Sequence, residues 1–219
     1  MNTRLHTLLL LIVLCLPLAC ARPARPTAET TRGITPDYVI TVAPFTQPVT
    51  TSQLITGALP ENQGRIPEDT LAALDMKLRE LLAPNAKRHY SFNFIARRHP
   101  LQDMTRFHNS EQPQALPHWV AYGKKLGAQA LLIPQILDWH ERAGSSAGVT
   151  ESALVRVEFF LLKIADGTIV NRTVFEEKQV GLAENLLTVG SFLKRRGSWV
   201  TASELAADGM EKAIRDMNL

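Results

Sequence analysis

Two long runs of strand-forming residues, joined by a short turn, constrain the fold more than any other feature of the chain. Residues 152–164 and 168–180 are rich in Val, Leu, Ile and Phe. Between them, Ala165-Asp166-Gly167 supplies the Asp-Gly pair that favours a tight turn between antiparallel strands. The pattern predicts a long β-hairpin, so we expect the fold to be built around a sheet.

The chain from residue 34 onward alternates between strand and helix patterns. β-branched or alternating apolar runs predict strands at residues 38–42, 89–95 and 130–139. Helices are predicted at residues 67–82, at residues 114–126 with Gly127 as C-cap, and after the capping box Thr201-Ala202-Ser203-Glu204. The predicted order is β-α-β-α-β-β-β-α, an α/β fold with α+β character in which helices pack on a mixed β-sheet.

The spacing of apolar residues indicates which faces of these elements are buried. The first helix carries a leucine stripe at Leu71, Leu74, Leu78 and Leu81. The second strand places Tyr90, Phe92 and Phe94 on one side, as a half-buried strand would. The strand at residues 130–139 is apolar on both faces through Ile133, which predicts a central position in the sheet.

The amino terminus has the pattern of a secretory signal. Residues 1–4 carry one positive charge, and residues 8–16 are almost entirely apolar, which is far short of the roughly 20 residues that cross a bilayer. The segment ending in Leu18-Ala19-Cys20-Ala21 resembles a bacterial lipoprotein signal, in which Cys20 would become the acylated first residue of the mature chain. The alternative is cleavage after Ala21, which would release a soluble periplasmic protein.

A tether is predicted to follow the signal. Residues 21–33 contain two prolines and three arginines and lack a large apolar residue, so they cannot bury enough surface to fold. The predicted organisation is a signal peptide at residues 1–19, the lipidated Cys20 and tether at residues 20–33, and a single α/β domain at residues 34–219. Because Ala21 rather than Asp follows Cys20, the lipoprotein sorting rule implies a periplasm-facing anchor in the outer membrane.

Charge and cysteine content exclude several classes of function. The chain has 24 Lys and Arg against 21 Asp and Glu, a net charge of +3 that becomes +2 once Arg4 is removed with the signal. So small an excess, spread along the chain, does not indicate nucleic-acid binding. Both cysteines, Cys15 and Cys20, lie in the signal region. The folded part therefore has neither disulfides nor thiolate chemistry.

Short apolar motifs and the order of elements carry a resemblance to a family. The first strand ends in Val42-Ala43-Pro44-Phe45, and Gly127-Ala128-Gln129-Ala130-Leu131-Leu132-Ile133 opens the central strand. These features resemble the small α/β domain of periplasmic lipoproteins. That group includes the curli-secretion lipoprotein, lipoprotein activators of penicillin-binding proteins, and the amino-terminal domain of TolB. The resemblance implies partner binding or assembly rather than catalysis; residues 143–150 are too short for a pore-forming hairpin.

Catalytic and metal-binding patterns are weak. The five histidines His89, His99, His108, His118 and His140 do not have the i, i+4 spacing of a helical zinc pair. Ser145-Ser146 lies in a predicted flexible loop at residues 144–148 without a nucleophile elbow. The adjacent Glu176 and Glu177 would point to opposite faces of a strand, which rules out joint acid-base work. We therefore expect no catalytic residue, no metal and no cofactor.

Two cationic clusters are candidate partner-binding sites. One comprises Lys194, Arg195 and Arg196 with Trp199, just before the terminal helix, and the other is Arg97-Arg98 after the second strand. Arg and Trp are enriched at binding surfaces, so an acidic partner or anionic headgroups would suit them. The alternative is a solvated loop whose Trp folds into the core.

The sequence therefore predicts a lipid-anchored, non-enzymatic envelope lipoprotein that acts in assembly or partner binding, with a membrane anchor and a possible homo-oligomer. Two alternatives stay open. One is a secreted periplasmic enzyme with a dispersed active site, and the other is a small-ligand or glycan-binding protein, which would need an aromatic-lined groove.

Overall fold

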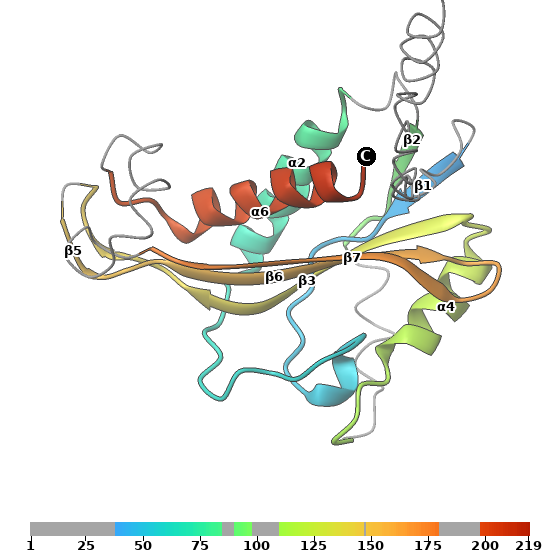
Figure 1. The fold of residues 1–219 in the computed structure, drawn as a ribbon, viewed down its shortest axis with the longest axis horizontal. Helices are drawn as coiled ribbons and strands as arrows, with labels where there is room; N and C mark the ends of the chain where they lie inside the picture. Colours follow the sequence, from blue (N-terminus) through green and yellow to red (C-terminus); the bar gives the residue numbers. More distant parts are fainter. Residues whose placement is uncertain (1–37, 85–89, 98–109, 147, 180–197) are drawn as a thin grey trace, which may run out of the picture. The chain divides into compact units, whose positions relative to one another are not determined.

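A mixed five-stranded sheet is the framework of the computed structural model, which describes residues 38–84, 90–97, 110–146, 148–179 and 198–219 (Figure 1). Its strands are β1 (Tyr38–Val42), β2 (Tyr90–Phe94), β3 (Ala130–His140), β6 (Leu154–Lys163) and β7 (Thr168–Lys178), in the spatial order β2-β1-β3-β6-β7. β1 is parallel to β2 and β3, whereas β3, β6 and β7 are antiparallel. The predicted signal peptide, Cys20 and tether lie outside the described residues.

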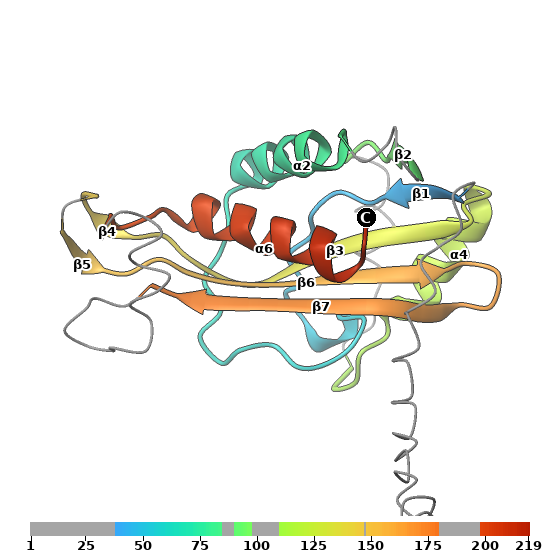
Figure 2. The same cartoon turned by 45° about the horizontal axis from the view of Figure 1, so that its top comes forward.

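Helices cover both faces of this sheet. α2 (Glu68–Leu82) and α6 (Ala202–Asp216) lie on one face, and α4 (Ala115–Lys125) lies on the other with the single-turn helix η1 (Thr51–Gln53) (Figures 1 and 2). The predicted α/β fold class is confirmed. Within the described residues, no helix combines the length and apolar content needed to cross a bilayer.

Three of the strongest sequence predictions are confirmed. β3 is central, and every residue from Ala130 to Trp139 is buried. β6 and β7 form the predicted hairpin, in which Gly167 has a φ of 72°, a conformation that glycine adopts without strain. α6 begins with the predicted capping box, because the Thr201 side chain accepts from the Glu204 N–H while the Glu204 carboxylate accepts from the Thr201 N–H.

Other predictions need correction. α2 begins at Glu68 with Pro67 as N-cap, and its buried stripe ends at Leu82 (0% exposed) rather than at Leu81, which is only partly buried. A separation of eleven residues is just over three full turns, so Leu82 returns to the face of Leu71. Of the predicted loop at residues 144–148, Gly144 belongs to β4 (Ala143–Gly144), whereas Ser145 and Gly148 exchange backbone hydrogen bonds between β4 and β5 (Val149–Glu151), which form a second, two-stranded sheet.

The sheet separates two apolar layers. Under α2 and α6 lie alternate residues of β1, β3 and β6, including Ile40, Leu132 and Phe159, which are at most 1% exposed. Under α4 lie the intervening residues, where Trp119 of α4 belongs to the same buried cluster as Ile133 and Phe160. Burying these side chains is the main source of stability for such a fold.

One buried charge interrupts the second layer. The Glu158 side chain is 1% exposed, and both its carboxylate oxygens accept hydrogen bonds from Arg172 at 2.8–3.1 Å. Arg156 lies 3.6 Å from the same carboxylate. The two guanidinium groups supply the opposite charge that a buried carboxylate requires.

Candidate binding clefts beside strand β2

β2 is an edge strand of the main sheet. Its five residues pair in parallel with β1, from Tyr38 opposite Tyr90 to Val42 opposite Phe94. None of the other described strands pairs with its outer edge. Tyr90, Phe92 and Phe94 are the more buried residues and alternate with the exposed Ser91 and Asn93, as predicted. An edge strand offers unused backbone donors and acceptors to an added strand.

The first cleft, which we call the α2-side cleft, lies between β2 and α2. It has a volume of about 310 Å³. The residues that line it are Val42, Ala43, Pro44, Asp75, Met76, Leu78, Arg79, Phe94 and Ile95. Met76 is 63% exposed, and the Arg79 guanidinium lies 4.4 Å above the Phe94 ring. Most of the lining is therefore apolar, with charged groups at Asp75 and Arg79.

The second cleft, the α4-side cleft, lies beside the same strand and borders the end of α4. It has a volume of about 370 Å³ and is lined by Thr41, Asn93, Phe94, Ile95, Tyr122, Lys125 and Leu126. Phe94 and Ile95 border both clefts. Because side chains alternate across a strand, a strand added to β2 would present successive side chains to the two faces of the sheet.

Arg97, one of the predicted site residues, supports the α2-side cleft from within. Its Nη2 lies 2.5 Å from Asp75 Oδ2, and its Nη1 donates to the Phe45 carbonyl at 3.0 Å and to Glu68 Oε1 at 3.3 Å. Asp75 Oδ1 accepts from the Phe45 N–H at 2.7 Å. The Arg97 side chain is only 16% exposed. The pair therefore fastens the segment after β1 to α2.

The electrostatics of Asp75 reflect this position. Burial raises the pKa of the Asp75 carboxyl above its usual value of 3.8. The hydrogen bond from Phe45 and the charge of Arg97 act in the opposite direction but do not offset the loss of water. Asp75 thus lines the cleft, and the charge of Arg97 favours the ionised form of its carboxyl.

Trp199, the second predicted site residue in the described part, lies elsewhere. Its N–H donates to the Ser146 carbonyl at 3.0 Å, and its carbonyl accepts from Arg142 Nη1 at 3.2 Å. Gln179 holds the same segment, donating to the Ser198 carbonyl at 2.9 Å and accepting from the Val200 N–H at 2.7 Å. The half-buried Trp199 is therefore fixed beside the small β4–β5 sheet.

The predicted cationic clusters are only partly described. Lys194, Arg195, Arg196 and Arg98 lie outside the described residues. Arg97 contacts Phe45 and Asp75 beside α2, whereas the Trp199 backbone contacts Ser146 and Arg142 beside the β4–β5 sheet, so the two residues are held by different parts of the fold. Partner binding by both clusters stays a prediction.

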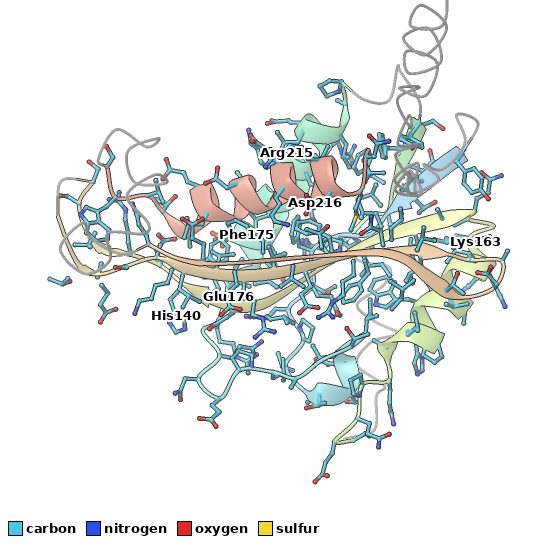
Figure 3. The ribbon with its side chains drawn as sticks, in the orientation of Figure 1. His140, Lys163, Phe175, Glu176, Arg215 and Asp216 are labelled. Carbon is cyan, nitrogen blue, oxygen red and sulfur yellow. The ribbon has the colours of Figure 1, made fainter. Side chains whose placement is uncertain are left out.

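Some of the residues considered for chemistry lie in the described part of the chain. His140, labelled in Figure 3, has its Nε2 at 3.0 Å from Asp138 Oδ1. Asp138 Oδ1 also accepts from the Gly64 N–H at 2.8 Å and so fastens the loop before α2 to β3. Glu176 is exposed and Glu177 is less so, in keeping with opposite faces of β7. The described residues hold no group of three or more His, Cys, Asp or Glu that could bind a metal ion.

Sequence reasoning missed the two clefts and the role of Asp75. One available signal was Met76, an apolar residue outside the leucine stripe of α2 that is left exposed by the fold. The other was the alternation in β2, which marks a half-buried strand but does not tell whether it lies at an edge.

Comparison with known proteins identifies structures but no family. No family model matches the sequence, and no curated protein matches it. The chain is similar to the PelC dodecamer structure from Paraburkholderia phytofirmans, with a TM-score of 0.45 and 12% identity over 84% of this chain and 90% of that one. It is also similar to the LpoB C-terminal domain from Salmonella enterica, with a TM-score of 0.34 and 12% identity over 68% and 87%. A third structure is the lipoprotein GNA1162 from Neisseria meningitidis, with a TM-score of 0.36 and 13% identity over 72% and 96%.

Proposed function

We propose that this chain is a lipid-anchored, non-enzymatic protein of the bacterial cell envelope that binds an extended segment of a partner protein along β2. The observation that carries the binding proposal is the pair of clefts on either side of one edge strand, which share Phe94 and Ile95. The signal pattern ending at Cys20 supports the anchor, and Ala21 supports outer-membrane sorting.

An added strand would use the two clefts differently. The backbone of the partner would hydrogen-bond to the outer edge of β2, which supplies affinity, and alternate side chains would enter the clefts, which supplies specificity. The α2-side cleft suits an apolar side chain, because Val42, Leu78 and Phe94 line it. The α4-side cleft suits a polar side chain, because Asn93 and Tyr122 line it.

Blocking the α2-side cleft tests this function. Met76→Glu places a charge at the apolar mouth without disturbing the core, because Met76 is 63% exposed. Val170→Glu on β7, where the native side chain is 42% exposed, is the matched control. Proteins crosslinked to each variant in intact cells are then compared. We expect Met76→Glu to lose the adducts seen with the native chain and Val170→Glu to keep them; equal adducts in both variants would refute binding at β2.

The anchor is tested separately. The native chain should incorporate labelled fatty acid such as palmitate and fractionate with outer-membrane markers, whereas Cys20→Ser should do neither. A mature chain that begins at Arg22 would show that the protein is secreted without a lipid.

A further inference from the structure

Three lysines gather at the end of the sheet where the described chain begins. Lys124 and Lys125 form the last turn of α4, and Lys163 ends β6. A cleft of about 340 Å³ is lined by Lys124, Lys163 and Tyr38, the first residue of β1. Figure 3 labels Lys163 beside the β6–β7 hairpin, and Figure 1 shows α4 ending at the same side of the molecule.

The composition of this end combines exposed charge with exposed apolar surface. Lys124 and Lys125 are exposed, and Lys163 pairs with Asp166 at 2.8 Å while its side chain stays 46% exposed. Lysines at a helix C-terminus stabilise the helix dipole, but that effect does not account for the neighbouring Leu126, which is 47% exposed. Basic residues around an exposed large apolar side chain are typical of surfaces that lie against anionic lipid.

The chain that joins the predicted anchor to this end indicates a lipid surface as its partner. Residues 21–37 join Cys20 to Tyr38, and fully extended they span at most about 60 Å. The start of β1 is therefore the point at which the chain leading from Cys20 enters the sheet. A tether of this length keeps that end at an effective concentration on the order of millimolar at the lipid surface, where weak binding suffices.

We propose that the end formed by Lys124, Lys125, Lys163 and Leu126, the membrane-facing end, docks on the anionic phospholipid headgroups of the membrane that carries the anchor. This proposal rests on the proposed anchor at Cys20. Each lysine near an anionic surface strengthens binding about fivefold. Because Asp166 offsets one of the three, the net gain is on the order of 25-fold.

Docking in this way sets the orientation of the molecule. The small β4–β5 sheet lies at the other end of the long strands from the β6–β7 hairpin (Figures 1 and 2). Trp199, which contacts Ser146 between β4 and β5, is at that far end. The membrane-facing end would thus direct Trp199 away from the bilayer.

Chemical tethering reproduces the anchored geometry without depending on acylation in the cell. The chain beginning at Cys20 has a single cysteine, so its thiol can be coupled to maleimide headgroups in vesicles. We compare vesicles of phosphatidylcholine with vesicles containing about 30% phosphatidylglycerol, and measure acetylation of each lysine by mass spectrometry. Lys77 and Lys178, on α2 and β7, are the internal controls.

The expected result is site-specific protection. On anionic vesicles, the acetylation rates of Lys124 and Lys125 should fall to roughly one third, or lower, of their rates on phosphatidylcholine vesicles. The rates of Lys77 and Lys178 should not change. About 0.5 M NaCl, which shortens the Debye length to about 4 Å, should abolish the difference. In the native chain, iodination of Tyr38, normalised to the acetylation of Lys77, should differ between the two kinds of vesicle. The triple variant Lys124→Gln, Lys125→Gln, Lys163→Gln should show the same Tyr38 iodination on both.

Two results would overturn the proposal: equal acetylation of Lys124 and Lys125 on both vesicles, or equal protection of Lys77 and Lys178. Neither depends on whether cells acylate Cys20, because the thiol is coupled chemically. A failed fatty-acid label with specific lysine protection would therefore refute the anchor but not the lipid-binding surface.

Discussion

Arg97 and Asp75 form an ion pair, 2.5 Å between Nη2 and Oδ2, that joins the residues after β2 to the middle of α2. Both partners also bind the backbone of Phe45, Arg97 through the carbonyl and Asp75 through the N–H. One pair thus connects three segments around the α2-side cleft. We infer that the shape of the cleft depends on this pair.

Removing the cation should destabilise the fold. Arg97→Met leaves Asp75, whose side chain is 25% exposed, without its guanidinium partner. We expect a loss of about 1–3 kcal/mol in the free energy of unfolding, measured by urea denaturation. Arg215→Met is the control, since Arg215 is 67% exposed and its ion pair with Glu211 is 3.7 Å long. A similar loss in both variants would show that the Arg97–Asp75 pair has no special role.

The pKa of Asp75 gives a second prediction. Because burial raises the folded-state pKa above the ordinary 3.8, the stability that this group contributes is fully present below pH 3.8 and is lost as pH rises through the folded pKa. Asp75→Asn should remove that component of the pH dependence. Carboxyl NMR should find Asp75 titrating above 3.8 and higher still in Arg97→Met. The pKa of Asp166, lowered to about 2 by Lys163 and Thr168, is the contrasting signal in the same spectrum. An Asp75 pKa below 3.8 would contradict this prediction.

The buried carboxylate of Glu158 gives a third prediction. Arg172→Met removes its bidentate partner and leaves only Arg156, at 3.6 Å. Breaking a buried pair from one side costs about 3–5 kcal/mol, and the 40% exposure of Arg172 places this site toward the lower value. The double variant Glu158→Gln, Arg172→Met should recover part of the loss. If thermal unfolding shows the double variant to be less stable than Arg172→Met, the uncompensated charge is not the cause.

The corrected stripe on α2 can be tested by paired truncations. Leu82 is 0% exposed, whereas Leu81 is only partly buried, so Leu82→Ala should cost about 2–5 kcal/mol and Leu81→Ala distinctly less. Chemical denaturation of the two variants checks the difference. A larger loss of stability in Leu81→Ala than in Leu82→Ala would instead support the stripe predicted from the sequence, which ended at Leu81.

Local patterns were sufficient to predict the elements of the fold, because each depends on residues close in the chain. The Asp166-Gly167 hairpin, the Thr201–Glu204 capping box and the central position of β3 are all confirmed. The β4–β5 pair and η1 were missed, since segments of two or three residues carry no readable period. The position of η1 also depends on a long-range contact, that of the Gln135 side chain with the backbone of Gln53 and Ile55.

The candidate site was harder to predict for a related reason. A cleft beside β2 exists only because β2 lies at the edge, and strand order follows from packing rather than from local pattern. Arg97 was identified from its charge, but its ion pair with Asp75 joins residues that lie far apart in the sequence. Such a contact leaves no mark in either local segment.

The central claim is that a partner segment lies along β2, and site-specific photocrosslinking in intact cells tests it most directly. A photoreactive residue replaces Met76 at the α2-side cleft, or Val170 on β7 as the control. The account predicts a defined adduct at position 76 and none at 170, with the crosslinked partner residues falling in one extended segment whose mutation abolishes the adduct. No adduct at position 76, or the same adduct at both positions, would contradict it.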